Sequence, residues 1–595
     1  MGKILSDYRR NPSRVILLFF IITVFSAKIS AEDLVHPEIA SAKQNLTNKQ
    51  AYSANSMVVT ANPYATNAAV KILQAGGSAV DAAIAAQMVL NLVEPQSSGI
   101  GGGGFLLFWD NNKQKLTHFN GRETAPEKVN NSHFLVENGK PMGFFDAVVG
   151  GYSVGTPGLL KMLEEAHARF GKLPWSALFA EAIQLANEGF IVSTRLNQSL
   201  QKLSKSQKNI RNSSMFTHFF QPSGEAVEAG SVLKNPALGK TFELIAKNNS
   251  EAFYQGKLAK KMVKAVRNNY FNSGYLSRKD LAQYETKIET ALCHSILDYK
   301  LCGAPPPSSG AITVIQILSM LSKTKGFHGM NPNSVGFYHR FIEATKLAFA
   351  DRNQYIADPE FVNIPTTTLV SDNYLQNRMQ LIPLLKASNK IRLAGDIDEV
   401  EFSFAQSPSL DSTTHLSIID QQGNIVSLTS SIEHAFGSRI WVDGFLLNNQ
   451  LTDFSFLPLN QKAESIANRI EPLKRPRSSM SPMIVFDNQN KPILVIGSPG
   501  GSWIIPFVAK VIALHVFLKA PLKQAIESPH IANINRSTTV IEQDTPDDLA
   551  DQLKQLGHTT KKRALASGIH AIQIQPKNYY GVADSRREGS SSATE

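Results

Sequence analysis

The stretch SLDSTTHLSIID (409–420) places four hydroxyl side chains directly before an alternating apolar strand. Serine is typical of the turn before a strand, and threonine is typical of the strand itself. A hydroxyl held next to a base can instead act as the nucleophile of an acyl transfer. The stretch is therefore either ordinary turn-and-strand sequence or the place of a nucleophilic hydroxyl. Its hydroxyl residues are Ser409, Ser412, Thr413 and Thr414, with His415 directly behind them.

The residues that follow predict a hairpin that gives one of these hydroxyls a partner. The segments THLSIID and NIVSLTSSI flank the loop DQQGN, and a five-residue loop pairs Ile419 with Ile425. In that register Thr413 lies opposite Ser431. A cross-strand Thr–Ser pair stabilises a sheet by about 0.2–1 kcal/mol without any chemistry. The pairing alone therefore favours a structural role.

A glycine pair elsewhere favours the chemical interpretation. The segment ILVIGSPGGSW (493–503) predicts a buried strand that runs into a tight turn and then a helix. Gly500 and Gly501 have no side chains to shield their N–H groups, and N–H groups before a helix N-terminus can hold a developing oxyanion. The alternative is a glycine pair that serves only the shape of the backbone.

Composition and the N-terminus narrow the class of protein. The chain has 595 residues, 43% apolar and 18% charged, which is typical of a folded globular protein. Its net charge of +11 is scattered, so nucleic-acid binding is not expected. A basic start, the apolar run VILLFFIITVF and small residues predict a signal peptide over 1–31. The run is shorter than the ~20 residues of a spanning helix, so we expect a periplasmic or secreted protein; the alternative is a membrane anchor.

The two cysteines, Cys293 and Cys302, lie on either side of a predicted hairpin turn near Asp298. If that hairpin forms, the two thiols can face each other, and export favours a disulfide. The alternative is two unpaired thiols. Only His294 lies nearby as a third ligand, so we expect no metal site.

The order of the predicted elements indicates an α+β core. Residues 32–55 form a polar lead-in, and residues 57–95 predict a short strand and two helices. Residues 155–400 are mostly helical in pattern, and 388–412 is a candidate exposed segment. After it the pattern turns to paired antiparallel strands. Helices and strands in separate runs are typical of a layered α+β fold.

Seven motifs in order make the chain similar to the γ-glutamyltranspeptidase family. They extend over residues 57–587, nearly the whole chain after the predicted signal peptide. The resemblance implies an N-terminal-nucleophile hydrolase with a four-layer αββα sandwich. The motifs are AGGSAVDAAIAA (75–86), GRETAP (121–126), PPPSSG (305–310), STTHLSIID (412–420), FLLNNQLTDF (445–454), KRPRSSMSP (474–482) and GSPGGS (497–502).

The resemblance also implies that the precursor cuts itself between Ser412 and Thr413. The products would be a large subunit (32–412) and a small subunit (413–595) that stay together as a heterodimer. Thr413 Oγ would attack the Ser412 carbonyl, and the resulting ester would hydrolyse. The freed α-amine, with an unperturbed pKa of about 7.7–8, suits a base at neutral pH. Nucleophile and base would then belong to one residue.

On the catalytic side of the implied site, Ser431 would hydrogen-bond Thr413, and Thr414 would help to position it. Gly500 and Gly501 would form the oxyanion hole. His415, which first suggests a triad, is expected to be a structural strand residue.

On the binding side of the implied site, Arg122 would grip the substrate α-carboxylate through charge-assisted hydrogen bonds. Ser478 and Ser479 would assist Arg122. Gln450 and Asp453 would hold the substrate α-amino group.

Three positions depart from the family pattern. Glu433 stands where family members usually carry an asparagine that contacts the amino-acid end of the substrate. A carboxylate there could hold an ammonium group or repel a carboxylate. Thr452 replaces the first aspartate of an Asp-Asp pair, and the lid-like segment 456–473 has no tyrosine or glycine.

The sequence thus predicts a self-cleaving enzyme that transfers or hydrolyses γ-glutamyl groups, as from glutathione. Water, amino acids or peptides would be the acceptors, and neither metal nor organic cofactor is expected. One alternative is a glutaryl- or cephalosporin-type acylase with the same mechanism, motivated by Glu433 and the altered lid. The other is an uncleaved relative that only binds, against which the intact Thr413, Gly500, Gly501 and Arg122 argue.

Overall fold

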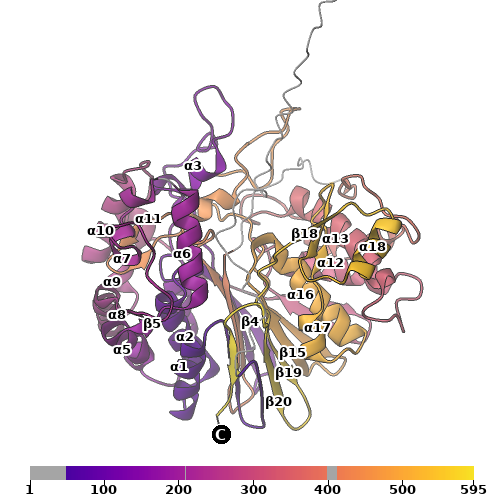
Figure 1. Cartoon of the computed structure of the whole chain (residues 1–595), viewed down its shortest axis with the longest axis horizontal. Coiled ribbons are helices and arrows are strands. Elements are labelled where there is room, and N and C mark those ends of the chain that lie inside the picture. Colours follow the sequence, from indigo (N-terminus) through magenta and orange to yellow (C-terminus); the bar gives the residue numbers. More distant parts are fainter. Residues whose placement is uncertain (1–47, 208, 398–411, 595) are drawn as a thin grey trace, which may run out of the picture. The chain divides into compact units, whose positions relative to one another are not determined.

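Two stacked β-sheets form the core of the computed structural model, which describes residues 48–207, 209–397 and 412–594 (Figure 1). Each sheet has seven strands. Helices cover the outer face of both sheets, so the chain forms four layers. The predicted α+β class and αββα sandwich are confirmed. The predicted signal peptide lies outside the described residues.

The first sheet carries the predicted hairpin near its centre. Neighbouring strands in it are all antiparallel. In spatial order the strands are β21 (Ser590–Ser592), β2 (Met57–Thr60), β10 (Thr414–Ile419), β11 (Ile425–Ser431), β3 (Gly103–Asp110), β4 (Lys115–Gly121) and β7 (Lys287–Glu289).

The second sheet begins at an edge strand that the sequence did not predict. Residues 50–53 fall in the expected polar lead-in, yet they pair with residues 579–582, and Tyr52 stacks on Tyr580 with ring centroids 4.3 Å apart. A segment with exposed side chains on alternate positions can occupy an edge because one of its faces stays in water. In spatial order the strands are β1 (Gln50–Ser53), β20 (Tyr579–Ala583), β19 (His570–Ile574), β15 (Pro492–Gly497), β14 (Met483–Asp487), β9 (Tyr299–Gly303) and β8 (Leu292–Ile296).

Side chains that alternate along the strands fill the space between the sheets. In β2, Met57 and Val59 belong to the cluster between the sheets, whereas Val58 belongs to the cluster under the helices. Both faces of this strand are covered, so all four of its residues are buried. The period of two in a strand therefore explains a continuous apolar run at this position.

The helices on the first sheet include the two that the sequence predicts after β2. They are α1 (Pro63–Gln74) and α2 (Ala79–Val93), and every residue of α2 is buried. A capping box between Ser78 and Asp81 begins α2. Its small alanines let it lie directly on β10 and β11. The same layer contains α4 (Leu159–Phe170), α5 (Ala180–Glu188) and α8 (Pro236–Asn248).

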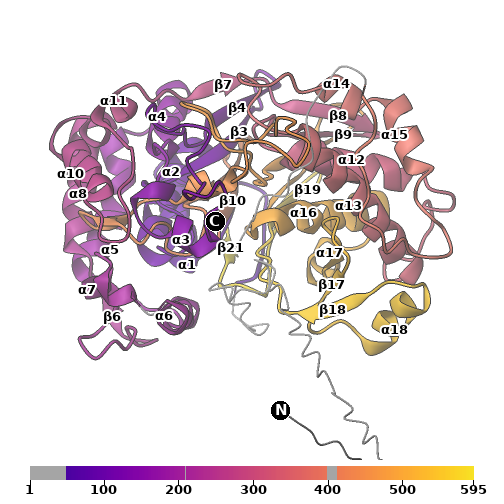
Figure 2. The same ribbon diagram turned by 90° about the horizontal axis from the view of Figure 1, so that it is seen from above.

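The helices on the second sheet come from residues after 309. Viewed from above in Figure 2, they lie together on the side opposite α1 and α2. Helix α12 packs on β8 and β9, and α16 packs on β15. The layer consists of α12 (Gly310–Ser322), α13 (Val335–Tyr355), α16 (Ile504–Ile512), α17 (Leu522–Glu527) and α18 (Asp547–Gln555).

Further helices and small sheets lie around these layers, and most of them come from the predicted helical region. None of the helices among the described residues is both long and apolar enough to cross a bilayer. The remaining helices are α3 (Phe144–Val148), α6 (Thr194–Ser206), α7 (Phe216–Phe219), α9 (Glu251–Tyr254), α10 (Gly256–Arg267), α11 (Arg278–Ala282), α14 (Thr366–Leu369) and α15 (Asp372–Met379). Small sheets join β5 (Phe190–Ile191) with β6 (Val232–Leu233), β12 (Trp441–Val442) with β13 (Phe445–Leu446), and β16 (Ile531–Ala532) with β17 (Thr539–Glu542) and β18 (Thr560–Arg563).

The predicted cysteine hairpin is the pair β8 and β9. Cys293 lies directly opposite Cys302 in the register, and the two form a disulfide. The bond crosses the edge of the second sheet.

The expectation of an exposed segment over 388–412 is wrong at its end. Residues 398–411 lie outside the described residues, and 388–397 contain neither helix nor strand. Ser412, however, is only 1% exposed, and its hydroxyl donates a hydrogen bond to the carbonyl of Gln96, in the turn after α2. The residue before the predicted nucleophile is thus fixed within the protein.

Candidate active site

The hairpin β10–β11 positions the predicted nucleophile. Ile419 pairs with Ile425 and Thr414 with Ser430, which confirms the predicted register. Thr413 comes one residue before β10, so it faces Ser431 at the end of β11. Their hydroxyl oxygens lie 3.4 Å apart. The five-residue loop at the far end of the hairpin therefore sets this contact.

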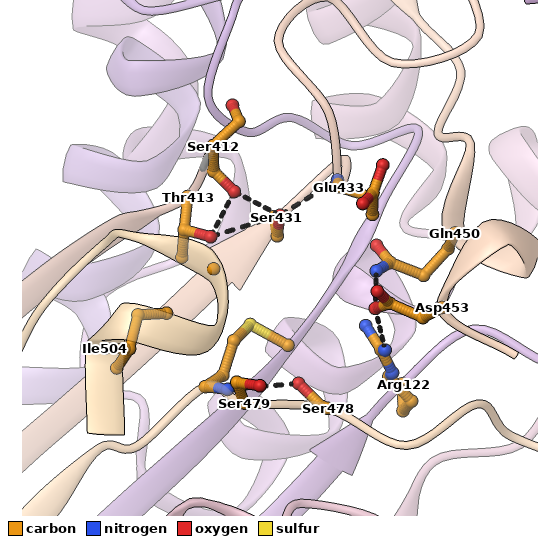
Figure 3. Close-up of a pocket in the computed structure, with 12 residues that line it drawn as sticks. Arg122, Ser412, Thr413, Ser431, Glu433, Gln450, Asp453, Ser478, Ser479 and Ile504 are labelled. Carbon is orange, nitrogen blue, oxygen red and sulfur yellow. Dashed lines mark hydrogen bonds and ion pairs between the residues drawn. The ribbon is translucent and has the colours of Figure 1, made fainter. Parts of the chain in front are cut away.

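Both hydroxyls point at the peptide bond before Thr413. The Thr413 hydroxyl donates to the carbonyl oxygen of Ser412, and the Ser431 hydroxyl donates to the same oxygen at 2.9 Å. Figure 3 shows the three residues together at one side of a pocket. A carbonyl that accepts a hydrogen bond is polarised toward nucleophilic attack, and here the Thr413 hydroxyl lies next to it.

The predicted glycine pair follows β15, as the sequence indicates. Gly500 and Gly501 have φ angles of +132° and +54°, and a 3₁₀ turn from Gly501 to Trp503 leads into α16. Positive φ favours glycine at both positions. A Cβ atom on Gly500 would also come within 2.8 Å of the Phe507 ring. Gly501 lines the pocket.

The opposite side of the pocket is built around a buried arginine. Arg122 directly follows β4 and is fully buried. Its Nη2 lies 2.6 Å from Asp453 Oδ2, and it donates further bonds to the carbonyls of Pro476 and Arg477. Gln450 Nε2 donates to the same Asp453 oxygen at 2.7 Å. Gln450 and Asp453 lie at the two ends of one 3₁₀ turn (Gln450–Asp453), which brings their side chains together.

A second carboxylate lies behind this arginine. Glu123 is fully buried, and its Oε2 is 3.5 Å from Arg122 Nη1. Burial raises the pKa of Glu123 to about 7, although the charge of Arg122 opposes the rise. Glu123 could not be predicted from the sequence, because nothing in GRETAP shows which way its side chain turns.

The serine pair connects the pocket to the second sheet's helices. The Ser478 carbonyl accepts hydrogen bonds from the backbone and side chain of Ser309. Ser479 Oγ accepts from Nη2 of Arg352 at 2.7 Å. Arg352 lies on α13 and also donates to Ser309. Its position in a long, almost wholly buried helix gave no sign of this bracing role.

Glu433 lies on the same side of the pocket as Arg122. It is 4% exposed, and its Oε2 accepts a hydrogen bond from the side chain of Asn449. Burial and, next, the negative charge of Asp453 raise the pKa of Glu433 well above its ordinary range. The residue that departs from the family pattern is thus a buried, electrostatically strained carboxyl group.

The pocket has a cavity volume of about 30 Å³ and brings together nine of the eleven predicted catalytic and substrate-binding residues. Thr414 and Gly500 are not among its lining residues, and the Thr414 hydroxyl is buried without a hydrogen-bond partner. Met480 and Ile504 line it without having been predicted. We call Ser412, Thr413, Ser431 and Gly501 the nucleophile wall, and Arg122, Glu433, Gln450, Asp453, Ser478 and Ser479 the anchor wall.

Two other side chains whose sequence context is typical of catalytic residues, His415 and Ser153, do not line the pocket. His415 is buried in β10, hydrogen-bonded to Thr429 and Ser417, and burial lowers its pKa well below the ordinary value. Ser153 occurs in GYSVG, which fits the G-x-S-x-G pattern of serine hydrolases. It lies in a 3₁₀ turn rather than between a strand and a helix, and its hydroxyl donates to Val148. Neither residue lines the pocket with Thr413.

Among the described residues, no group of three or more His, Cys, Asp or Glu is arranged to hold a metal ion.

Comparison with known proteins identifies the family. The γ-glutamyltranspeptidase family model matches residues 65–594. The chain belongs to the γ-glutamyltranspeptidase family. It is 36% identical to the glutathione hydrolase proenzyme of Bacillus subtilis over 550 residues, with 90% of each chain covered. Membership makes the protein an enzyme of γ-glutamyl transfer or hydrolysis.

Solved structures agree with the family assignment. The cephalosporin acylase of Bacillus halodurans superposes with a TM-score of 0.80 at 26% identity, covering 94% of this chain and 100% of that one. The Helicobacter pylori γ-glutamyltranspeptidase gives a TM-score of 0.53 at 28% identity, covering 58% of this chain and 95% of that one. The first comparison supports the fold over nearly the whole chain.

Proposed function

We propose that the protein is a precursor that cuts itself before Thr413 and then cleaves γ-glutamyl amides of the glutathione type. The observation that carries this proposal is the contact of the Thr413 hydroxyl with the Ser412 carbonyl, which Ser431 also hydrogen-bonds. The name of the B. subtilis relative, a glutathione hydrolase proenzyme, supports both the self-cleavage and the donor.

Self-cleavage begins when Thr413 Oγ attacks the Ser412 carbonyl carbon. The hydroxyl of Ser431 stabilises the negative oxygen that forms, because it already donates to that oxygen at 2.9 Å. The C–N bond breaks, its nitrogen becomes the free amine of Thr413, and water hydrolyses the remaining ester. The large subunit (32–412) and the small subunit (413–595) stay together as a heterodimer.

The same hydroxyl then attacks the γ-carbonyl of the donor. The α-amine of Thr413 takes its proton, and the N–H groups of Gly500 and Gly501 hold the oxyanion. The amine of the leaving group receives the proton, and a γ-glutamyl ester remains on Thr413. Water or the amine of an amino acid or peptide then attacks this ester and releases the enzyme.

The anchor wall binds the amino-acid end of the donor. Arg122 takes the α-carboxylate, with Ser478 and Ser479 beside it, because a guanidinium can form two parallel bonds to a carboxylate. Gln450 and Asp453 take the α-amino group. Thr414 supports the nucleophile from the strand behind it. All of these groups belong to the chain itself, so the reaction as proposed uses no cofactor.

The predicted signal peptide and the disulfide between Cys293 and Cys302 together support a periplasmic or secreted enzyme. Disulfides persist in oxidising compartments, and they are rare in the reducing cytosol.

A denaturing gel with N-terminal sequencing tests the proposed cleavage. We expect two fragments from the wild-type chain, with the smaller one beginning Thr-Thr-His-Leu. Thr413→Ala should remain a single chain and lose activity by about 10⁴-fold or more, because the nucleophile is gone. Ser430→Ala, which removes a neighbouring hydroxyl that bonds to Gln87, is the matched control and should still be cut. A single uncut chain in an active wild-type preparation would contradict the proposal.

A second candidate activity is that of a glutaryl- or cephalosporin-type acylase. The similarity to the B. halodurans acylase and the carboxylate of Glu433 favour it. Turnover of γ-glutamyl and glutaryl anilides separates the two activities. Faster turnover of the glutaryl compound, which lacks the α-amino group, would favour the acylase.

A further inference from the structure

One surface loop carries the two most exposed large apolar side chains of the described residues. They are Leu385, which is 86% exposed, and Leu393, which is 83% exposed. A single exposed leucine is ordinary on a protein surface, but a group of exposed apolar side chains marks a place that another surface covers. We call residues 380–393 the apolar loop, and none of them lines the pocket. Its other exposed apolar residues are Leu381, Leu384 and Ile391, each about half exposed.

Hydrogen bonds and one buried side chain hold the apolar loop on the body of the protein. Arg392 Nη2 donates to the carbonyl of Leu381 at 3.3 Å, which joins the two ends of the loop. The N–H of Ala387 donates to the carbonyl of Leu556 at the end of α18, and Ile382 is buried beneath. The loop therefore runs from α15 to α18, at the outer edge of the second sheet's helices (Figure 2). Compact loops with joined ends are frequently functional, and this one presents its leucines from an anchored backbone.

Every charged side chain of the apolar loop is positive. The sequence QLIPLLKASNKIRL contains three cations and no carboxylate. Arg392 pairs with Glu343 of α13 at 2.7 Å. Lys386 and Lys390 are exposed, and neither has an ion-pair partner within the described ranges of the chain. A lysine can lay its stem along an apolar surface while its ammonium group stays at a polar boundary.

The neighbouring segment does not reverse this charge. Residues 547–563, which include α18 and β18, carry four cations and three carboxylates. Two of the carboxylates, Asp547 and Asp551, form ion pairs with Lys562 and Lys554. Leucines beside unpaired ammonium groups therefore complement a partner that is apolar inside and negatively charged at its surface.

We propose that the apolar loop docks the protein on an anionic phospholipid surface. The exposed leucines enter the boundary between headgroups and acyl chains, and the ammonium groups of Lys386 and Lys390 contact lipid phosphates. The loop contains neither helix nor strand, so it offers no regular face to a protein groove, whereas a lipid surface adapts to the side chains it meets. Docking involves no residue of the pocket and is independent of the proposed function.

Flotation with lipid vesicles tests the docking. The protein used begins after the predicted signal peptide, with its N-terminus verified by sequencing, so that the apolar run 15–25 plays no part. We expect flotation at low salt with vesicles of phosphatidylcholine that contain ~30% phosphatidylglycerol. With phosphatidylcholine alone the partition coefficient should fall about 20-fold, since each of the two lysines contributes about fivefold on an anionic surface. High salt should cause a similar fall, because it screens these charges.

Two double variants separate the apolar and the electrostatic contributions. Leu385→Ser with Leu393→Ser should weaken binding to the anionic vesicles by about 100-fold, or about tenfold for each leucine lost. Lys386→Ala with Lys390→Ala should weaken it by about 20-fold and abolish the preference for phosphatidylglycerol. Neither change affects a buried side chain, so both variants should keep the wild-type unfolding temperature and the wild-type turnover of L-γ-glutamyl-p-nitroanilide.

Matched controls come from the opposite helical layer. Val232→Ser with Leu244→Ser removes two exposed apolar side chains on β6 and α8. Lys257→Ala with Lys260→Ala removes two exposed lysines on α10. Both control variants should float with the anionic vesicles as the wild type does.

Hydrogen exchange of the wild type gives a second measurement that needs no variant. On anionic vesicles, exchange should slow in residues 380–393 and stay unchanged in α10. Absence of flotation, equal flotation of the leucine variant and the wild type, or protection confined to another surface would overturn the proposal. A wild-type dimer in light scattering that Leu385→Ser with Leu393→Ser dissociates would also overturn it, because a second copy would then cover the loop. Failure to turn over the γ-glutamyl anilide would refute only the proposed function.

Discussion

The nucleophile wall takes three of its four residues from one hairpin and its approach, whereas the anchor wall is gathered from segments more than 300 residues apart. The first wall holds neutral hydroxyls and a carbonyl. The second holds buried charges in contact, with Arg122 between Asp453 and Glu123. Local sequence can set the geometry of a bond to be broken. Charge recognition in a low-dielectric pocket needs partners that only the complete fold brings together.

Of the changes that separate the two walls, Arg122→Ala in the anchor wall should cause the largest loss of activity. The change removes the partner of the donor carboxylate and leaves the half-buried Asp453 without its ion-pair partner, so kcat/KM should fall by about 10²–10³-fold. Self-cleavage should persist, because the nucleophile wall is intact. Steady-state kinetics and a gel measure both. Arg169→Ala, an exposed arginine on α4, is the control; a loss below tenfold for Arg122→Ala would remove it from donor binding.

In the nucleophile wall, Ser431→Ala should slow self-cleavage by about 10²-fold, because one donor to the Ser412 carbonyl is lost. The rate is the time course of the small subunit on a gel. Ser430→Ala is the matched control, since its hydroxyl bonds to Gln87 rather than to Ser412. Equal cleavage rates for the two variants would show that Ser431 does not polarise the peptide bond.

The titration of Glu123, which lies behind Arg122, should make the stability of the protein depend on pH. The pKa of Glu123 rises from 4.5 to about 7 on folding, so between these values the folded chain holds a proton that the unfolded chain has lost. The free energy of unfolding should therefore fall by about 3 kcal/mol from pH 4.5 to 7 and stay level above.

Glu123→Gln should abolish that fall, as measured by guanidinium unfolding at pH 5 and pH 8. Glu127→Gln, an exposed carboxylate on the same segment, should leave the fall in place. The same pH dependence in wild type and Glu123→Gln would assign the titration to another group.

The smallest effect on activity should follow removal of the disulfide, which belongs to neither wall. Replacing both Cys293 and Cys302 by serine opens a short loop and should cost about 2–3 kcal/mol of stability. Values of kcat and KM should be unchanged, because the bond lies at the edge of the second sheet. A parallel loss of activity and stability would mean that this edge is coupled to the pocket.

The contrast between the walls also explains what the sequence could predict. The loop DQQGN and alternating strands were enough to place Thr413 against Ser431, since a hairpin register follows from local rules. The bracing by Arg352 and the buried position of Glu123 were not predictable in this way. Each depends on which face a residue turns toward segments far away in sequence. The edge strand β1 was missed because Gln50–Ser53 is only four residues long and contains no β-branched residue, so it carries little strand signal.

The interleaving of the strands has a consequence for the protein after cleavage. A cut before Thr413 would assign β2, β3, β4 and β7 of the first sheet to one polypeptide, and β21, β10 and β11 to the other. The second sheet also mixes the two polypeptides. Its four central strands belong to the small fragment, and β1, β8 and β9 of the large fragment lie at its edges. Separating the two polypeptides would therefore mean tearing open both sheets. Dilution should leave the pair intact, and its lifetime should equal that of the native state.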